Sequence, residues 1–461
     1  MFRYFFTILT VALFTAISAL AMASESTWPA GDWRGTLNAG GQELGIVYHL
    51  QVDDDQASGT MDVPAQGAMG LPLPAVETEG DRLTIKMPLP GQARFEGSRA
   101  GDAIKGTFSQ AGQSFPLTLE RAVSAAPPKR PQEPSEPLPY RSEAVSFEGA
   151  GEIRLAGTLT RPEGSGPFPG VVLVAGAGPH DRDGTFMNHR PLLVLADYLT
   201  RAGFSVLRFD ERGIGESAGE FASASGEALA GDIAAAIETL RQQEDSDPAR
   251  IGLLAHSEGG RTAALAIAAH ESIDFLVMLG APARPGIEAL RAQAERSANP
   301  IAGLQAAMAE AALEIKPGES TDRPLREAAS EFMETLPDEQ RAALSGQAQT
   351  IVDQLVQGLS QPQARFSLAF DPRPALEDAD IPVLALYGGK DRQIDAAGAE
   401  QAWRAALESD ATIETLPNLN HFFQEADTGA PSEYASIEQT IAPAALARIV
   451  DWLISLTGGA Q

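Results

Sequence analysis

Between residues 170 and 280, short apolar runs alternate with helix-length amphipathic stretches, and this alternation limits the possible folds most strongly. The runs GVVLVAG (170–176) and RIGLLAH (250–256) are apolar throughout, which is typical of strands buried on both faces. Alternating units of this size predict a parallel sheet covered by helices on both faces. The predicted strands are 170–176, 204–210, 250–256, 274–280, 381–389 and 411–416, and the predicted helices are 191–203, 227–243, 259–270, 396–408 and about 437–456.

Two regions of different composition precede this α/β region, which occupies residues 141–461. Residues 24–124 contain apolar residues at every second position, as from Leu44 to Val52, which predicts a small antiparallel all-β domain. Residues 125–140, AAPPKRPQEPSEPLPY, contain six prolines and no apolar periodicity. We expect this linker to be an extended, semi-rigid spacer.

The first 23 residues have the pattern of a cleavable signal peptide. Arg3 supplies a positive charge, residues 5–20 are apolar and uncharged, and small residues at Ala21 and Ala23 offer cleavage sites. We therefore expect an exported protein, periplasmic or extracellular. No other long apolar run follows, so no membrane anchor is expected in the mature chain.

Composition excludes several classes of site. The chain contains no cysteine, which rules out cysteine nucleophiles, cysteine-ligated metals and iron–sulfur clusters. Its formal net charge of −28 argues against nucleic acid and anionic membrane as partners. A small-molecule partner is expected, and the sequence does not indicate an oligomeric state.

Ser257 is the predicted nucleophile because it lies directly between a buried strand and a helix. A sharp turn there exposes the hydroxyl, and the turn needs small neighbours, which Gly259 and Gly260 provide. The match to G-x-S-x-G is imperfect, since position 255 is alanine. Residues 215–219 match that motif letter for letter, but Ser217 lies in a long loop without a strand–turn–helix context.

A serine hydroxyl needs a base, and the base needs an orienting acid. Of the six histidines, His421 alone follows the last predicted strand, while His256 is expected to point to the opposite side of the strand end. Asp391 follows strand 381–389 closely and is the favoured acid, with Asp395 as the alternative.

An oxyanion requires preorganised N–H donors. We expect one from Glu258 and one from the loop after strand 170–176, with Ala177 favoured over Gly176. That loop also resembles a dinucleotide fingerprint, but Asp181 stands where the third glycine would be. His180, Asp181 and Asp183 match no common metal spacing. No cofactor and no metal are predicted.

Residues 283–373 interrupt the alternation with helical sequence throughout. We interpret this segment as a cap inserted between two core strands, and expect it to supply the acyl or alcohol pocket. Every candidate catalytic residue follows the linker, so a chain beginning near Arg141 is expected to fold and retain the chemistry.

Five segments in order resemble bacterial α/β-hydrolases grouped as serine aminopeptidase S33-like or esterase D-type proteins, and residues 24–124 resemble the extra domain ahead of some of them. The segments are VVLVAGAGPHDRDGT, RFDERGIGESAG, AHSEGG, YGGKDRQI and LNHFF. The resemblance implies an α/β-hydrolase fold and serine-dependent hydrolysis of carboxylic esters through an acyl-enzyme. Asp210 and Arg212 are interpreted as structural. A peptidase or amidase and a non-catalytic binding protein remain alternatives.

Overall fold

The computed structural model describes most of the chain between Trp28 and Gly458. The predicted signal peptide at residues 1–23 lies outside the described residues. The chain divides into two compact units, Met1–Ala125 and Ala126–Gln461. The described ranges are 28–39, 42–53, 56–63, 68–87, 93–110, 113–121, 129–270, 272–297, 299–316, 318–345, 348–407 and 411–458.

The described part of the first unit is one nine-stranded antiparallel sheet, which confirms the prediction of a small all-β domain. Neighbouring strands in sequence pair with one another except β4 with β5, and β1 also pairs with β9, so the sheet runs β4-β3-β2-β1-β9-β8-β7-β6-β5. Trp33, Tyr48 and Phe95 are among its fully buried side chains. The strands are β1 (Gly31–Ala39), β2 (Gln42–Asp53), β3 (Gln56–Val63), β4 (Ala68–Pro72), β5 (Ala75–Glu79), β6 (Arg82–Lys86), β7 (Arg94–Ala100), β8 (Ala103–Gln110) and β9 (Gln113–Arg121).

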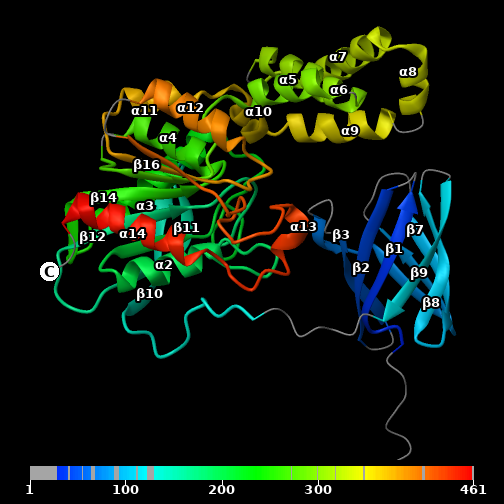
Figure 1. Cartoon of the computed structure of the whole chain (residues 1–461), viewed down its shortest axis with the longest axis horizontal. Helices are drawn as coiled ribbons and strands as arrows, with labels where there is room; N and C mark the ends of the chain where they lie inside the picture. The colour runs from blue at the N-terminus through cyan, green and yellow to red at the C-terminus, as the bar shows by residue number, and fades with distance from the viewer. Residues whose placement is uncertain are drawn as a thin grey trace, which may run out of the picture. The chain divides into compact units, whose positions relative to one another are not determined.

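The second unit is built on a sheet whose eight described strands run β10-β11-β13-β12-β14-β15-β16-β17 (Figure 1). Strands β10 and β11 form an antiparallel hairpin at one edge, and the six strands from β12 to β17 are parallel. Apart from that edge hairpin, this is the predicted parallel sheet. The strands are β10 (Arg141–Gly149), β11 (Ile153–Arg161), β12 (Phe168–Val174), β13 (Ser205–Phe209), β14 (Ser246–His256), β15 (Leu276–Leu279), β16 (Val383–Gly388) and β17 (Ala411–Leu416).

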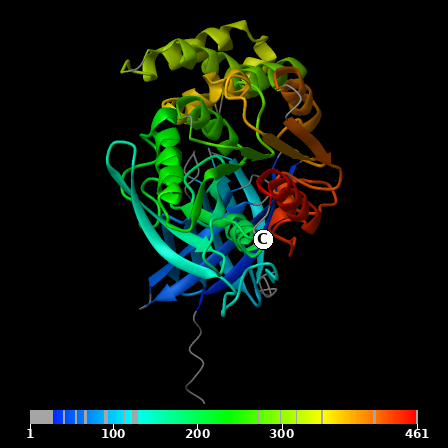
Figure 2. The ribbon, with the colours of Figure 1, turned by 90° about the vertical axis from the view of Figure 1, so that its left-hand side faces the viewer.

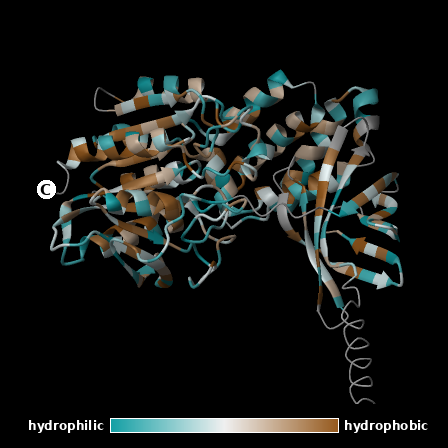
Figure 3. Cartoon of the chain, turned by 60° about the horizontal axis from the view of Figure 1, so that its bottom comes forward, coloured by the Kyte–Doolittle hydropathy of each residue, from teal (hydrophilic) through white to brown (hydrophobic). Residues whose placement is uncertain are grey.

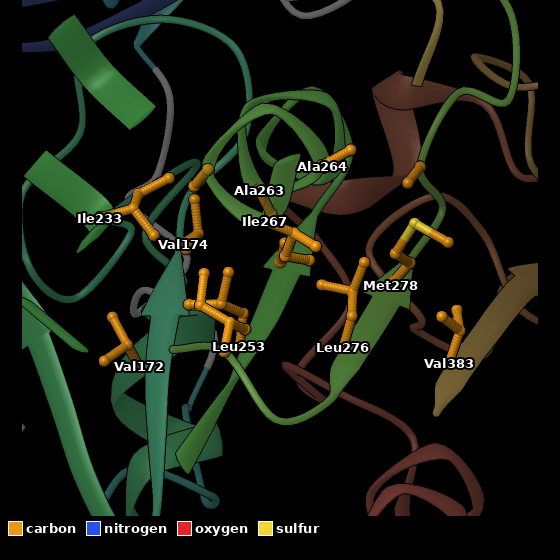
Figure 4. Packing of buried hydrophobic residues seen from close by; sticks show 14 of the residues in the cluster. Val172, Val174, Ile233, Leu253, Ala263, Ala264, Ile267, Leu276, Met278 and Val383 are labelled. Carbon is orange, nitrogen blue, oxygen red and sulfur yellow. The ribbon is translucent and has the colours of Figure 1, made fainter. Parts of the chain in front are cut away.

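Helices cover both faces of this sheet, which is why central strands such as β12 and β15 are buried at every position. Val172 and Leu253 belong to the core under α3, α4, α11 and α12, whereas Val171 and Leu254 belong to the core under α2 and α14. Figure 4 shows the first of these cores between the strands and α4, and Figure 3 shows hydrophobic residues along the central strands. The helices are α2 (Pro191–Arg201), α3 (Gly226–Arg241), α4 (Gly259–Ala269), α11 (Pro372–Glu377), α12 (Ala396–Ala406), α13 (Pro431–Tyr434) and α14 (Pro443–Thr457).

Between β15 and β16 the chain forms a helical insertion, which Figures 1 and 2 both show gathered at one side of the second unit. It has its own apolar core, which includes Leu304, Met308 and Leu325. The buried guanidinium of Arg261 donates to the carbonyls of Arg284 and Phe370, and so ties the two ends of the insertion to α4. The helices are α5 (Gly286–Arg296), α6 (Pro300–Glu314), α7 (Asp322–Thr335), α8 (Asp338–Ser345), α9 (Ala348–Leu359) and α10 (Pro362–Ala369).

No helix of the described residues is both long enough and apolar enough to cross a membrane.

Candidate active site

Ser257 occupies a strained turn between β14 and α4. Its φ is 52°, in the left-handed region that non-glycine residues rarely adopt, and its N–H donates to the carbonyl of Leu279 at 2.8 Å. The chain is closely packed just after this turn. A Cβ on Gly259 would lie 2.0 Å from the carbonyl oxygen of Ala175, and one on Gly260 would lie 2.5 Å from the Cβ of Ala281. Both glycines are therefore required by packing.

We expect Gly259→Ala to destabilise the protein by about 2 kcal/mol or more and to lower activity, because the Ala175 backbone would have to move. Gly358→Ala is the matched control, since it lies in α9 with nothing within 4 Å of its added Cβ. It should stabilise the protein by up to about 1 kcal/mol. Thermal unfolding measures both, and a Gly259→Ala protein as stable as the parent would contradict this packing argument.

The structure brings Ser257, His421 and Asp391 together at the carboxyl ends of three parallel strands. The Nε2 of His421 lies 3.0 Å from the Oγ of Ser257, and its Nδ1 lies 2.7 Å from Oδ2 of Asp391. Both partners of this second pair have buried side chains. The other carboxylate oxygen of Asp391 accepts the N–H groups of Gln393 and Ile394, which fixes the orientation of the carboxylate.

The two alternative residues have other roles. Asp395 is the N-cap of α12 and accepts the N–H of Gly398 at 3.1 Å. Ser217 is buried, donates to the carbonyl of Asp210 at 2.7 Å and accepts the N–H of Ala156 at 2.9 Å. Its hydroxyl is thus used in holding the loop after β13 to β11.

The N–H groups of Ala177, of its neighbour Gly176 and of Glu258 donate to no acceptor among the described residues. Ala177 and Gly176 both line the cavity over Ser257. Glu258 directly follows Ser257, and its carboxylate turns away to pair with Arg261 at 2.8 Å. Unpaired N–H groups beside a serine hydroxyl can accept a developing negative charge.

A cavity of about 190 Å³ opens over Ser257 and is mainly apolar. The rings of Phe186 and Phe422 stack on each other in its wall, with centroids 4.9 Å apart. We expected residues 283–373 to supply this pocket, but none of its lining residues comes from that segment. The lining residues are Ala175, Gly176, Ala177, His180, Gly184, Phe186, Pro191, Leu192, Leu195, His256, Ser257, Leu279, Gln393, His421, Phe422, Phe423 and Ile441.

The expected orientation of His256 was wrong. Its ring lines the same cavity as Ser257, packs against the rings of His421 and Phe422, and lies 3.1 Å from the carbonyl of His421 through Nε2. Burial lowers the pKa of His256 to about 3, so the ring is neutral and Nε2–H donates to that carbonyl. Strand alternation suggested the opposite side, but the turn at Ser257 breaks the alternation.

The remaining polar candidates are engaged in internal contacts. Asp181 accepts the N–H and hydroxyl of Thr185, and Asp183 pairs with Arg208 at 2.9 Å. In the first unit, His49 lies between Asp32 and Asp62, and these hydrogen bonds, led by that with Asp62, raise its pKa to about 9. Among the described residues, no group of three or more histidine or acidic side chains could hold a metal ion.

Glu211 holds the loop that carries Ala177, and no pattern in the sequence singled it out. Its carboxylate accepts the N–H of His180 at 2.7 Å, while its own N–H donates to the carbonyl of His180 at 3.1 Å. Asp210 likewise binds the N–H and guanidinium of Arg182. Arg212 pairs with Asp232 in the interior. Asp210 and Glu211 therefore support the loop after β12, whereas Arg212 is bonded to α3.

Burial, and to a lesser degree the charge of Asp232, raise the pKa of Glu211 from 4.5 to about 8. Between pH 4.5 and about 8, the folded chain keeps a proton on Glu211 that the unfolded chain has released. The free energy of unfolding therefore falls as pH rises through this range. We expect Glu211→Gln to keep the hydrogen bond to His180 and to raise the melting temperature more at pH 8 than at pH 5. Each kcal/mol of added stability should raise the melting temperature by roughly 2–4 °C. Calorimetry at both pH values measures this, and an equal difference at both would contradict it.

Comparison with known proteins places these features in a family. The sequence model described as "Serine aminopeptidase, S33" matches residues 190–425, a little more than half of the chain. The chain belongs to this family. It is 32% identical over 158 residues to esterase EstD of Thermotoga maritima, covering 34% of this chain and 36% of that protein. It is also 32% identical over 124 residues to the uncharacterized protein YfhR of Escherichia coli K12, covering 27% of this chain and 41% of that protein.

The aligned part of this S33-family chain thus spans well under half of the length of either curated relative. Among solved structures, an esterase of Pyrococcus furiosus is similar with 13% identity and a TM-score of 0.39, covering 69% of this chain and 93% of that one. The second unit has the α/β-hydrolase fold with a helical insertion, and the first unit is an all-β domain ahead of it.

Proposed function

We propose that this α/β-hydrolase is a serine esterase that cleaves carboxylic esters through an acyl-enzyme. The observation that carries the proposal is the single histidine, His421, within hydrogen-bond reach of both the Ser257 hydroxyl and the Asp391 carboxylate. A base joined to a nucleophile on one side and to an orienting acid on the other is the arrangement that activates a serine.

In the proposed mechanism, His421 Nε2 takes the Ser257 proton while Oγ attacks the carbonyl carbon of the ester. The resulting oxyanion accepts the N–H groups of Ala177 and Glu258. His421 then protonates the leaving alcohol as the C–O bond breaks, which leaves an acyl-Ser257. Water, deprotonated by His421, repeats the addition and releases the carboxylic acid, and the proton returns to Ser257.

The cavity lining favours an ester over an aminopeptidase substrate. An aminopeptidase must bind the positively charged amino group at the start of its peptide, which calls for a carboxylate or other acceptor near the nucleophile. No aspartate or glutamate lies among the residues that line the cavity over Ser257. An uncharged acyl group suits such an apolar wall. The name of the relative EstD also supports an esterase.

Two assays test the proposal. The purified protein should hydrolyse p-nitrophenyl butyrate and should be labelled on Ser257 by a fluorophosphonate probe. It should release p-nitroaniline from alanine p-nitroanilide at least about a hundredfold more slowly, a difference of about 2.8 kcal/mol in barrier. Faster cleavage of the amide would favour a peptidase, and no labelling with no hydrolysis would favour a binding protein.

We also propose that residues 1–23 direct export and are removed, as their charged start, apolar stretch and small-residue end suggest. Sequencing the N-terminus of protein recovered outside the cytoplasm would test this. A mature chain that still begins at Met1 would contradict it.

A further inference from the structure

The proline-rich segment does more than join the two units. Its described part, residues 129–140, belongs to the second unit. Its side chains contact two loops of that unit, residues 186–189 and residues 434–442. We will call residues 130–133 the strap. The sequence predicted a spacer here, and a spacer requires no such contacts.

Arg130 binds both loops with one guanidinium. Its Nε donates to the carbonyl of Asn188 at 2.9 Å and its Nη1 to the carbonyl of Ile437 at 2.6 Å. Its Nη2 donates to the carbonyls of Ala435 at 3.0 Å and Met187 at 3.4 Å. A planar group with five N–H donors in a fixed fork can hold several carbonyls in one geometry, which an ammonium group cannot.

Gln132 and Glu133 add further bonds. The amide of Gln132 donates to the carbonyl of Ile441 at 2.6 Å and accepts the N–H groups of Thr440, at 2.6 Å, and Ile441, at 3.1 Å. Glu133 forms an ion pair with Arg190, the residue that precedes α2. The strap therefore supplies hydrogen-bond partners to backbone groups of both loops.

The first loop needs this support because of its own backbone. Phe186 and His189 exchange two backbone hydrogen bonds at 2.9 Å, and the two residues between them, Met187 and Asn188, have φ values of 49° and 61°. A two-residue turn with both central residues left-handed favours glycine, asparagine or aspartate, so Met187 is strained there. Arg130 donates to the carbonyls of both central residues, which favours this conformation.

Both loops reach the proposed active site. The first carries Phe186, whose ring stacks on Phe422, the residue after His421. The second carries Ile441, which lines the cavity, and is followed by Ala442, whose N–H donates to the carbonyl of Phe423 at 2.7 Å. The strap thus binds the backbone of two loops that contribute Phe186 and Ile441 to the lining of the cavity.

We propose that Arg130 and Gln132 are positioning residues, which hold the loops at 186–189 and 434–442 so that the cavity wall and the His421 segment keep their geometry. The expected effect on kcat/KM rests on the proposed esterase function, whereas the expected support of the two loops does not. The catalytic module accordingly begins before Arg130, and a chain that starts near Arg141 would lack part of its active-site support.

The test uses the full-length chain and p-nitrophenyl butyrate. Arg130→Ala should lower kcat/KM tenfold or more, and Arg130→Lys should recover only part of this, because an ammonium keeps the charge but loses the fork. Lys129→Ala is the matched control, since it removes an exposed neighbouring cation that makes no described contact, and it should stay within twofold of the parent. The kcat and KM values, measured separately, report on chemistry and on the cavity wall.

Amide hydrogen exchange provides a readout independent of activity. In Gln132→Ala, the N–H groups of Thr440 and Ile441 should exchange at least tenfold faster than in the parent. In Gln132→Glu, which retains an acceptor oxygen, the increase should be smaller. Faster exchange with unchanged kcat/KM would overturn the positioning role, and unchanged exchange would overturn the strap itself. If the parent protein hydrolysed no ester, the proposed function would fail, while the exchange result would still decide whether the strap holds the loop.

Discussion

Replacing Ser257 with alanine is expected to abolish ester hydrolysis while leaving the fold intact. In another serine hydrolase, loss of the nucleophile lowered the rate by roughly 10⁶, and a loss of that order is expected here because the Ser257 hydroxyl is the group that His421 Nε2 contacts. Alanine also fits the site, since the Ser257 side chain contributes one short hydroxyl. The measurements are steady-state kinetics with p-nitrophenyl butyrate and a thermal unfolding curve.

Ser217→Ala is the matched control, because Ser217 stands in the literal G-x-S-x-G motif. Its hydroxyl bonds to the carbonyl of Asp210 and the N–H of Ala156 in the interior, so its loss should cost about 1–3 kcal/mol of stability. Activity per folded molecule should remain within about tenfold of the parent. If Ser217→Ala removed activity and Ser257→Ala did not, the assignment of the nucleophile would be wrong.

The position of Ser257, Asp391 and His421 could be predicted because of how a parallel sheet is built. The carboxyl ends of parallel strands lie at one edge, so residues that directly follow β14, β16 and β17 meet there although they are far apart in sequence. The same reasoning separated Asp391 from Asp395, because Asp391 is nearer the end of β16 and Asp395 lies further along the chain, at the start of α12. Local motif matching alone would have chosen Ser217.

Other features depend on tertiary contacts that the periodicity of apolar residues in the sequence does not predict. His256 and Ser257 line one cavity because the left-handed turn at Ser257 ends the strand alternation, and the cavity wall follows from the pairing of Phe186 with Phe422 across many intervening residues. The helical insertion could be recognised by its composition, but whether its helices reach the cavity could not. The role of Arg130 was hidden because a basic residue among prolines is typical of a solvated linker.

Asp391→Asn is expected to lower kcat by about 10⁴ with little change in stability, as the equivalent change does in another triad. The amide can keep one oxygen on the N–H groups of Gln393 and Ile394, so the backbone turn should survive. Its NH₂ group would then face Nδ1 of His421, where the carboxylate oxygen lies 2.7 Å away in the parent. Because a donor now faces Nδ1, that nitrogen must accept, and the ring proton moves to Nε2.

A ring protonated on Nε2 can no longer accept the proton of Ser257, which explains why the loss should appear in kcat rather than in KM. Asp395→Asn is the control, and it should retain activity and stability because asparagine also caps helices well. Asp395→Ala should cost about 1 kcal/mol of stability, again without a large kinetic effect. Kinetics and thermal unfolding of the three variants measure these outcomes, and equal kinetic losses at positions 391 and 395 would show that His421 is oriented by something other than the Asp391 carboxylate.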